Sequence, residues 1–165
     1  MIKYGLCGRS LKHSYSKVIH NFLGNDEYEL YSLEKDEFYD LMEGRNFKAL
    51  NVTIPYKEVV IPYLDEIDEA AKLIGAVNTV VNKNGRLYGY NTDFYGMTEL
   101  IKFTGIDIKN KKVIILGTGG TSKTAFAISK HLQAKEIIKV SRSGKDGAIT
   151  YEEALKNHTD AEIII

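Results

Sequence analysis

The sequence predicts an α/β protein of two parts, an N-terminal α/β domain over residues 1–104 and part of a doubly wound parallel sheet over residues 105–165. Three observations carry this prediction. Short apolar runs alternate with helical stretches along the chain. The turn signal Asn82-Lys83-Asn84-Gly85 separates two strand-like runs in the first part. In the second part an apolar strand, a glycine turn, a helix and another strand follow one another.

Each element of the first part is predicted from its apolar pattern and its flanking turn residues. We expect strands at residues 2–8, 28–33, 47–52, 77–81 and 87–90. Helices are expected at 14–23, 35–42, 65–74 and 93–103, with a short helical stretch between Pro55 and Pro62. Gly105 interrupts the last helix, so we place the domain boundary between residues 104 and 105.

For the second part the sequence predicts three strands and two helices, which make up half of a doubly wound sheet. Residues 161–165 resemble the start of a buried strand. A parallel strand that stops there would leave backbone groups unpaired. We therefore expect the chain to be part of a longer protein.

The amino-acid composition limits the classes of molecule that the chain is expected to bind. Lys and Arg together number 22, as do Asp and Glu, and no basic stripe is present, so nucleic acid and membrane surfaces are not expected partners. No long apolar run or signal peptide is apparent, and the cytoplasm is the expected location. The single cysteine, Cys7, lies in an apolar strand and is expected in the core, and no metal site is expected.

The segment 113–145 is typical of a βαβ unit that binds a phosphorylated nucleotide. The apolar run 113–116 leads into Gly117, Thr118, Gly119, Gly120 and Thr121, where a helix begins. Gly117 permits the tight turn, and Gly119 lets the backbone approach a pyrophosphate, which the N–H groups of the next helix would face. We predict a Rossmann-type dinucleotide site.

Two other interpretations of this loop stay open. Residues 117–124 nearly match the phosphate-binding pattern GxxxxGK[ST], but Ser122 stands where that pattern has glycine. The dinucleotide pattern also usually has Gly or Ala at that point, unless Gly120 serves as its third glycine. A glycine-rich turn without a ligand is the remaining alternative.

The end of the second strand of this unit predicts NADP rather than NAD. A carboxylate that would bond the ribose 2′-hydroxyl of NAD is absent, and Ser141, Arg142, Ser143 and Lys145 follow the strand instead. Arg142 can bind a 2′-phosphate with its planar fork, the two hydroxyls can donate to it, and Lys145 adds charge. A solvated basic turn is the alternative.

Polar residues gather at the ends of elements in the first part. Ser14 and Ser16 stand at a helix start, where their hydroxyls either cap the helix or bind a small carboxylate. Asp93 is an ordinary N-cap or a site residue. Lys57 falls in the first turn of a helix, where a cation is unfavourable, which indicates another role.

These patches together resemble the NADP-dependent shikimate dehydrogenase family. The matching motifs are His13-Ser14-x-Ser16-x-x-x-His20-Asn21, Asn51-Val52-Thr53-x-Pro55-x-Lys57, Ile74-Gly75-Ala76-Val77-Asn78-Thr79, Asn91-Thr92-Asp93-x-x-Gly96 and Gly117-x-Gly119-Gly120. The resemblance implies an N-terminal substrate-binding domain followed by a partial NADP-binding domain. It departs from the family at Ser10, Lys17 and Ala49, at Ser141 where Asn is usual, and at Lys145, which comes one position early.

The resemblance also implies roles for individual residues. Ser14 and Ser16 would bind the shikimate carboxylate, and Thr53, Asn78 and Asp93 the ring hydroxyls. Lys57, paired with Asp93, would be catalytic, and Ser141, Arg142 and Ser143 would bind the 2′-phosphate. The family chain continues further, supplying the remaining sheet and a late Gln that contacts substrate.

The implied reaction is the reversible NADP-dependent reduction of 3-dehydroshikimate to shikimate in aromatic amino-acid biosynthesis, by a monomer or a homodimer. Lys57 would take the hydroxyl proton or stabilise the alkoxide as a cation. Three alternatives remain: a quinate/shikimate dehydrogenase, a fragment that binds substrate without turnover, and a P-loop phosphotransferase.

Overall fold

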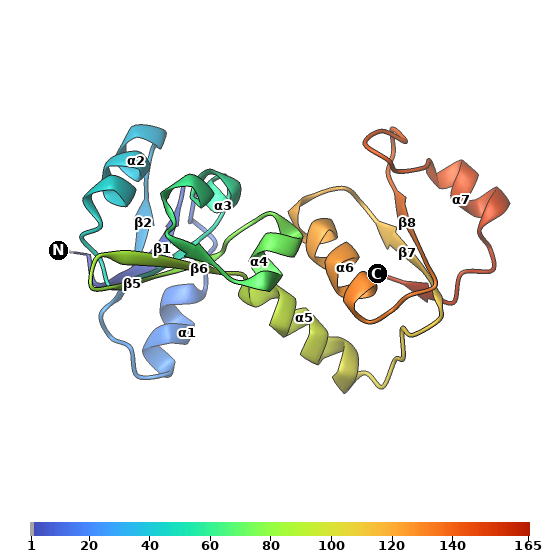
Figure 1. The fold of residues 1–165 in the computed structure, drawn as a ribbon, viewed down its shortest axis with the longest axis horizontal. Helices are drawn as coiled ribbons and strands as arrows, with labels where there is room; N and C mark the ends of the chain where they lie inside the picture. Colours follow the sequence, from blue (N-terminus) through green and yellow to red (C-terminus); the bar gives the residue numbers. More distant parts are fainter. Residues whose placement is uncertain (1) are drawn as a thin grey trace. The chain divides into compact units, whose positions relative to one another are not determined.

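The computed structural model describes residues 2–165, and the chain divides into two compact units, residues 1–92 and 93–165. Both units combine helices with a sheet, and their elements are drawn in Figure 1. The predicted α/β class is confirmed.

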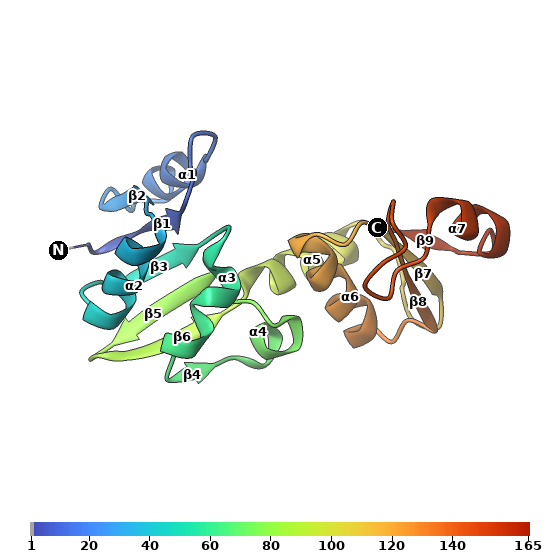
Figure 2. The same ribbon diagram turned by 90° about the horizontal axis from the view of Figure 1, so that it is seen from above.

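The first unit is built on a mixed sheet whose strand order is β2-β1-β3-β5-β6-β4 (Figure 2). Its strands are β1 (Tyr4–Gly8), β2 (Tyr28–Ser32), β3 (Ala49–Val52), β4 (Glu66–Ile67), β5 (Thr79–Lys83) and β6 (Arg86–Tyr90). β1 pairs in parallel with β2 and β3, and β5 runs antiparallel to β3 and β6. The carboxyl ends of β1, β2 and β3 therefore lie at one edge, where the start of β5 also lies.

Helices cover both faces of this sheet. They are α1 (Ser16–Phe22), α2 (Lys35–Gly44), α3 (Tyr56–Val59) and α4 (Glu69–Ile74), with a 3₁₀ turn at Ile61–Tyr63. Figure 1 shows α1 on the opposite side of the sheet from α2 and α3. Phe38 of α2 and Tyr56 of α3 pack with Cys7 and Val52 in the larger core. The α1 side has a smaller core of Leu6, Leu11 and Tyr28.

Local chemistry sets two boundaries that differ from the sequence prediction. The helix expected over residues 65–74 begins only at Glu69, because the side chain of Asp68 caps it by accepting the N–H of Ala71. Residues 66–67 form β4 instead. The hairpin turn is tighter than expected, since Asn84 and Gly85 both adopt positive φ, 54° and 86°, and the strands extend to meet them.

The second unit holds an all-parallel sheet of order β8-β7-β9. Its elements are α5 (Thr92–Phe103), β7 (Lys112–Leu116), α6 (Gly120–His131), β8 (Glu136–Val140), α7 (Tyr151–Asn157) and β9 (Ile163–Ile164). Ala125 of α6 packs with Val113 and Ile115 of β7, while Ala154 of α7 packs with Ile114 on the other face. Helices on both faces make the sheet doubly wound, as predicted.

The division between the units falls at residues 92 and 93. The helix α5 packs with the second unit, because Phe94 lies edge-on to His131 and because Met97 and Ile101 join the cluster around Ile108. The sequence placed this helix with the first domain, ahead of a boundary at 104/105.

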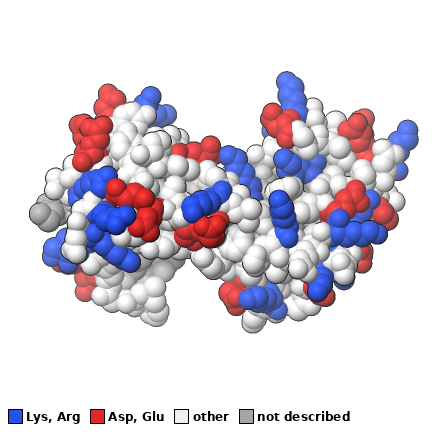
Figure 3. Space-filling view, in the orientation of Figure 1, with Lys and Arg blue, Asp and Glu red and all other residues white. Residues whose placement is uncertain are grey.

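The surface carries charges of both signs. On the face drawn in Figure 3, Lys and Arg side chains are interspersed with Asp and Glu side chains. Among residues 2–165, no helix is both long enough and apolar enough to cross a bilayer.

Candidate functional site

A network of polar side chains runs from Tyr28, at the start of β2, to the end of β3 and the start of β5 in the first unit. The Tyr28 hydroxyl donates to Asn51 Oδ1 at 2.7 Å, and Asn51 Nδ2 donates to Thr79 Oγ1 at 3.1 Å. Thr79 Oγ1 in turn donates to Asn78 Oδ1 at 3.0 Å. Because β2, β1, β3 and β5 are consecutive in the sheet, these residues come together although 51 positions separate Tyr28 from Thr79 in sequence.

Within this network of polar side chains, Asn78 makes the largest number of hydrogen bonds. Its side chain is buried, at 7% exposure. Asn78 Oδ1 also accepts the backbone N–H of Thr92 at 2.9 Å, and Asn78 Nδ2 donates to Thr92 Oγ1 at 3.0 Å. With its oxygen occupied by these donors, the amide has one fixed orientation, and its second N–H hydrogen can serve a ligand.

Ser14 and Ser16 stand at the start of α1, as predicted. Ser14 Oγ accepts the N–H of Ser16 at 3.2 Å, so this hydroxyl oxygen satisfies a backbone donor at the helix start. The hydroxyl hydrogen of Ser14 is not used in that bond and can donate to a ligand. Both serines are half-buried.

Thr53 and Lys57 follow β3. The Thr53 N–H donates to the Cys7 carbonyl at 2.9 Å, and the Thr53 carbonyl accepts the N–H of Tyr56 at 2.8 Å. Lys57 is half-buried in α3, and its carbonyl accepts the N–H of Val77 at 2.8 Å. These backbone bonds attach the Thr53 and Lys57 segment to β1 and to the segment that carries Asn78.

Asp93 is the second residue of α5 and belongs to the second unit. It is exposed and lies in the first turn, where a carboxylate interacts favourably with the helix dipole. Its predicted pairing with Lys57 stays a prediction.

Burial controls the titration of two groups near the strand ends. Burial raises the pKa of the Tyr28 hydroxyl to about 12, with the negative form of Cys7 acting in the same direction and the Ser16 hydroxyl against it. Burial also raises the pKa of the Cys7 thiol to about 12. Both groups therefore stay protonated at neutral pH, and Cys7 Sγ lies 3.4 Å from the Asn51 carbonyl oxygen. Cys7 is a core residue, as predicted.

The glycine loop of the second unit has the shape that a pyrophosphate needs. Gly117 has φ of 114°, a conformation that L side chains rarely adopt. A Cβ added to Gly117, Gly119 or Gly120 would meet no atom within 4 Å, so the space above the loop is open. The loop lines a pocket of about 250 Å³ together with Ile115, Leu116, Thr121, Ser122, Ala125 and Ile165.

The loop also lies at the right place in the sheet. It follows β7, and the chain visits β8 on one side of β7 before returning to β9 on the other. The carboxyl end of a strand where the order reverses is where open α/β sheets bind their ligands. α6 starts at Gly120, so the N–H groups of its first turn face the pocket beside the loop, as an anion site at a helix start requires.

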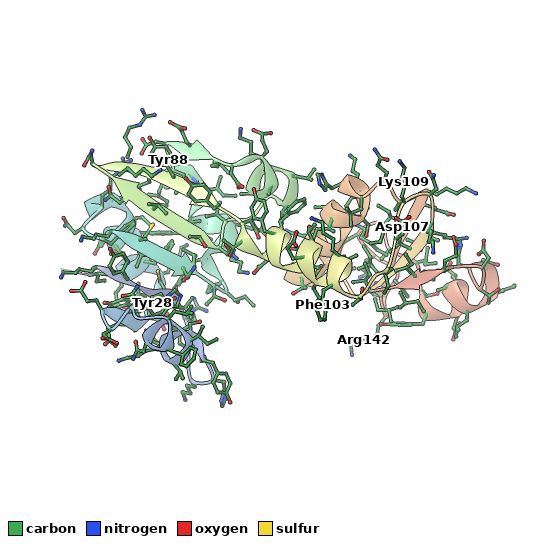
Figure 4. The ribbon with its side chains drawn as sticks, turned by 90° about the horizontal axis from the view of Figure 1, so that it is seen from below. Tyr28, Tyr88, Phe103, Asp107, Lys109 and Arg142 are labelled. Atoms are coloured by element: carbon green, nitrogen blue, oxygen red, sulfur yellow. The ribbon has the colours of Figure 1, made fainter. Side chains whose placement is uncertain are left out.

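The basic turn after β8 is partly prearranged. Ser141 is buried, and its Oγ accepts the N–H of Gly144 at 3.2 Å, which closes the turn. Arg142, Ser143 and Lys145 are all exposed around it, and Figure 4 shows Arg142 projecting from the unit. Their contact with a 2′-phosphate stays a prediction.

Sequence reasoning assigned no role to four residues of the polar chain. Asn51, Thr79 and Thr92 lay within the quoted motifs, where a polar residue at a strand end was the available signal. Tyr28 carried no such signal, because an aromatic residue at the start of a strand is ordinary. In the part of the chain that the structure describes, no cluster of His, Cys, Asp and Glu is arranged to hold a metal ion.

Sequence comparison identifies relatives of the chain. Residues 6–80 match the family model described as the shikimate dehydrogenase substrate binding domain. A shikimate dehydrogenase (NADP(+)) of Clostridium beijerinckii is 39% identical over 168 residues, covering 97% of this chain. The chain spans 62% and 64% of the length of this and another curated relative, from Clostridium botulinum.

Solved structures agree in fold. Shikimate dehydrogenase 1 from Peptoclostridium difficile superposes with a TM-score of 0.81 at 34% identity, covering 99% of this chain and 66% of that chain. Shikimate 5-dehydrogenase from Thermus thermophilus, solved with NADP(H) and shikimate, superposes with a TM-score of 0.82 at 28% identity, covering 99% and 67%. Residues 6–80 thus match the shikimate dehydrogenase substrate binding domain, and nearly the whole chain is similar in sequence and fold to shikimate dehydrogenases.

Proposed function

We propose that the chain binds shikimate and NADP and serves the NADP-dependent interconversion of 3-dehydroshikimate and shikimate, a step of aromatic amino-acid biosynthesis. The observation that carries the proposal is the fixed orientation of the Asn78 amide at the ends of the strands, close in the fold to Asn51, Thr79 and Thr92. Such a set of directed donors and acceptors suits a polyhydroxylated ring. A relative of the same fold is solved with NADP(H) and shikimate.

The substrate would be held by residues of both hydroxyl and amide type. Ser14 and Ser16 would donate to the carboxylate, and Thr53 and Asn78 would bond ring hydroxyls. Asp93 would bond a ring hydroxyl and orient Lys57. These assignments are supported by the serines at the start of α1 and by the backbone bonds that fix Thr53 and Lys57.

The chemistry requires a proton to leave the substrate hydroxyl as the hydride leaves the same carbon. NADP supplies the hydride acceptor when it is bound. Lys57 would take the proton, or stabilise the developing alkoxide as a cation. Residues 117–121 would hold the pyrophosphate, and Ser141, Arg142, Ser143 and Lys145 would hold the 2′-phosphate.

A second candidate is binding of shikimate without turnover. It is favoured by one observation: the family model match covers residues 6–80, and the polar chain from Tyr28 to Thr92 is contained in the first unit. A relative of the same fold is solved with shikimate, which supports a small-molecule substrate in both cases.

One experiment tests both candidates. The purified chain is titrated with shikimate by calorimetry, and NADPH formation is then followed with shikimate and NADP⁺, with NAD⁺ and quinate as comparators. Binding with NADPH formation supports the dehydrogenase. Binding alone selects the second candidate, and the absence of any shikimate binding contradicts both.

A further inference from the structure

We propose that Tyr28 is a positioning residue for Asn78, acting through the hydrogen bonds of Asn51 and Thr79. The inference rests on the proposed function, in which Asn78 bonds a hydroxyl of the substrate. Figure 4 shows Tyr28 on the side of the first sheet that carries α1.

The bonds of this polar network run in one direction from Tyr28, and the bond from Asn51 Nδ2 to the Asn78 carbonyl at 3.4 Å supports the same direction. The phenol donates its single hydrogen to Asn51 Oδ1, 2.7 Å away, so the Asn51 amide must turn its nitrogen toward Thr79. The Thr79 oxygen accepts that N–H and gives its own hydrogen to Asn78 Oδ1 at 3.0 Å. The Asn78 oxygen accepts this hydrogen together with the Thr92 N–H at 2.9 Å and the Thr92 hydroxyl at 3.2 Å, so the Thr79 bond is one of three that orient the amide.

Removal of the phenolic hydroxyl of Tyr28 would leave the side-chain amide of Asn51 less firmly oriented. Asn51 Oδ1 would lose its donor, and the amide could rotate so that its oxygen takes the Thr79 hydrogen instead. Asn78 would then lose one of its oxygen's donors while keeping the N–H of Thr92. With one donor fewer on its oxygen, the buried Asn78 amide would be held less firmly by its remaining bonds to Thr92 and would bind a ligand less well.

Tyr28 is itself held firmly. Its ring is 2% exposed and stacks face to face on His20, with ring centroids 3.7 Å apart and planes 5° apart. His20 belongs to the motif that begins at His13, and the proposed function assigns it no contact with substrate. Because burial raises the pKa of Tyr28 to about 12, the phenol remains a donor at neutral pH.

The test compares two buried tyrosines that both stack on another ring and whose hydroxyls reach different partners. Tyr56 is 1% exposed, and its hydroxyl donates to the Leu33 carbonyl at 2.6 Å, outside the polar chain. Tyr28→Phe and Tyr56→Phe each remove one buried hydroxyl and leave the ring in place. Shikimate affinity is measured by calorimetry on the 165-residue chain, and stability by urea unfolding.

We expect both variants to be less stable, but only Tyr28→Phe to weaken shikimate binding, by about 3- to 10-fold, the loss that one directed hydrogen bond corresponds to. Asn78→Ala should weaken binding as well, and the double variant with Tyr28→Phe should bind no more weakly than Asn78→Ala alone. His20→Ala should lower affinity in the same way as Tyr28→Phe, and His20→Phe should restore it by restoring the stack.

The outcomes separate the two proposals. Failure of the unaltered chain to bind shikimate overturns the proposed function and this inference with it. If the unaltered chain binds, equal affinity of Tyr28→Phe and Tyr56→Phe overturns the inference alone. Additive losses in Tyr28→Phe and Asn78→Ala would also overturn it, because they would show that Tyr28 acts by another route. If the double variant does not fold, the His20 pair decides in the same terms.

Discussion

Gly8 and Thr53 approach so closely that a Cβ on Gly8 would lie 2.5 Å from Thr53 Cγ2. Gly8 ends β1, and Thr53 follows β3, which pairs in parallel with β1. The same Cβ would also lie 3.2 Å from the Ile54 carbonyl oxygen, so the backbone that carries Thr53 limits how far the threonine can retreat. A residue without a side chain at position 8 thus sets the position of a candidate substrate-binding hydroxyl.

Replacement of Gly8 by alanine is expected to displace Thr53 and to lower the free energy of unfolding by about 1–3 kcal/mol, the usual cost of overpacking. Shikimate affinity should fall in parallel. Urea unfolding and calorimetry measure the two effects. Gly96→Ala is the matched control, because its added Cβ meets nothing within 4 Å in the helix α5. That variant should gain about 0.5–1 kcal/mol, and a loss of similar size in both variants would contradict the steric argument.

Lys57→Ala is expected to lower kcat for shikimate oxidation by about 10²–10⁴-fold with a much smaller change in KM, because a proton-transfer group acts chiefly in the transition state. Initial rates of NADPH formation over a range of shikimate concentrations give both constants. The exposed Lys35, at the start of α2, provides the control Lys35→Ala. A rise in KM with kcat unchanged would make Lys57 a binding residue only.

Arg142→Ala should weaken NADP binding by about 10- to 100-fold, the effect of losing charge-assisted hydrogen bonds to a phosphate. NAD lacks the 2′-phosphate, so its affinity should not change. Titration of both nucleotides against the variant measures the difference. Arg9→Ala removes an equal charge from the first unit, where Arg9 lies 3.5 Å from Glu34, and should leave both affinities unaltered. Equal losses of NADP and NAD affinity in Arg142→Ala would show that Arg142 does not bind the 2′-phosphate.

Asp65 is expected to make stability fall in acid. The backbone N–H of Leu87, 2.7 Å from Asp65 Oδ2, holds the pKa of this carboxyl below its ordinary value of 3.8, and Arg45 at 2.8 Å acts in the same direction. A lowered folded-state pKa contributes stability that is fully present above pH 3.8 and is lost as the pH falls through the folded-state value. Urea unfolding across this range should show a steeper loss for the unaltered chain than for Asp65→Asn.

The exposed Asp26 offers the control for that experiment, since Asp26→Asn changes the net charge by the same amount. Its unfolding curve should keep the acid dependence of the unaltered chain. An Asp65→Asn variant with that same dependence would show that another carboxyl is responsible.

Local patterns in the sequence were sufficient to predict most of the helices and strands and the glycine loop after β7. Apolar runs and turn residues predicted β1, β2, β3 and the hairpin of β5 and β6, because such patterns depend on residues that are close in sequence. The turn after β7 uses a positive φ at Gly117, which glycine adopts readily, so the glycine turn could be predicted from the sequence alone. Boundaries were less secure where a single side chain decides, as at Asp68, whose cap shortens α4.

Some residues of the candidate substrate site could be predicted from the sequence, and others could not. Ser14, Thr53 and Asn78 were identifiable as polar residues at element ends, and their family motifs implied roles for them. The partner of Asn51 was not identifiable, because Tyr28 reaches it only through the parallel pairing of β1 with both β2 and β3. Likewise the close approach of Gly8 and Thr53 exists only after those two strands are in register.

The sequence by itself therefore determined the α/β class, the glycine loop, the basic turn after β8 and the residue types available for binding. The tertiary structure alone decided which of those residues touch one another and which way the amides of Asn51 and Asn78 face. The physical reason is that periodicity and turn chemistry are local properties of the chain. Hydrogen-bond direction depends on the partner that the sheet brings alongside, and no local pattern specifies that partner.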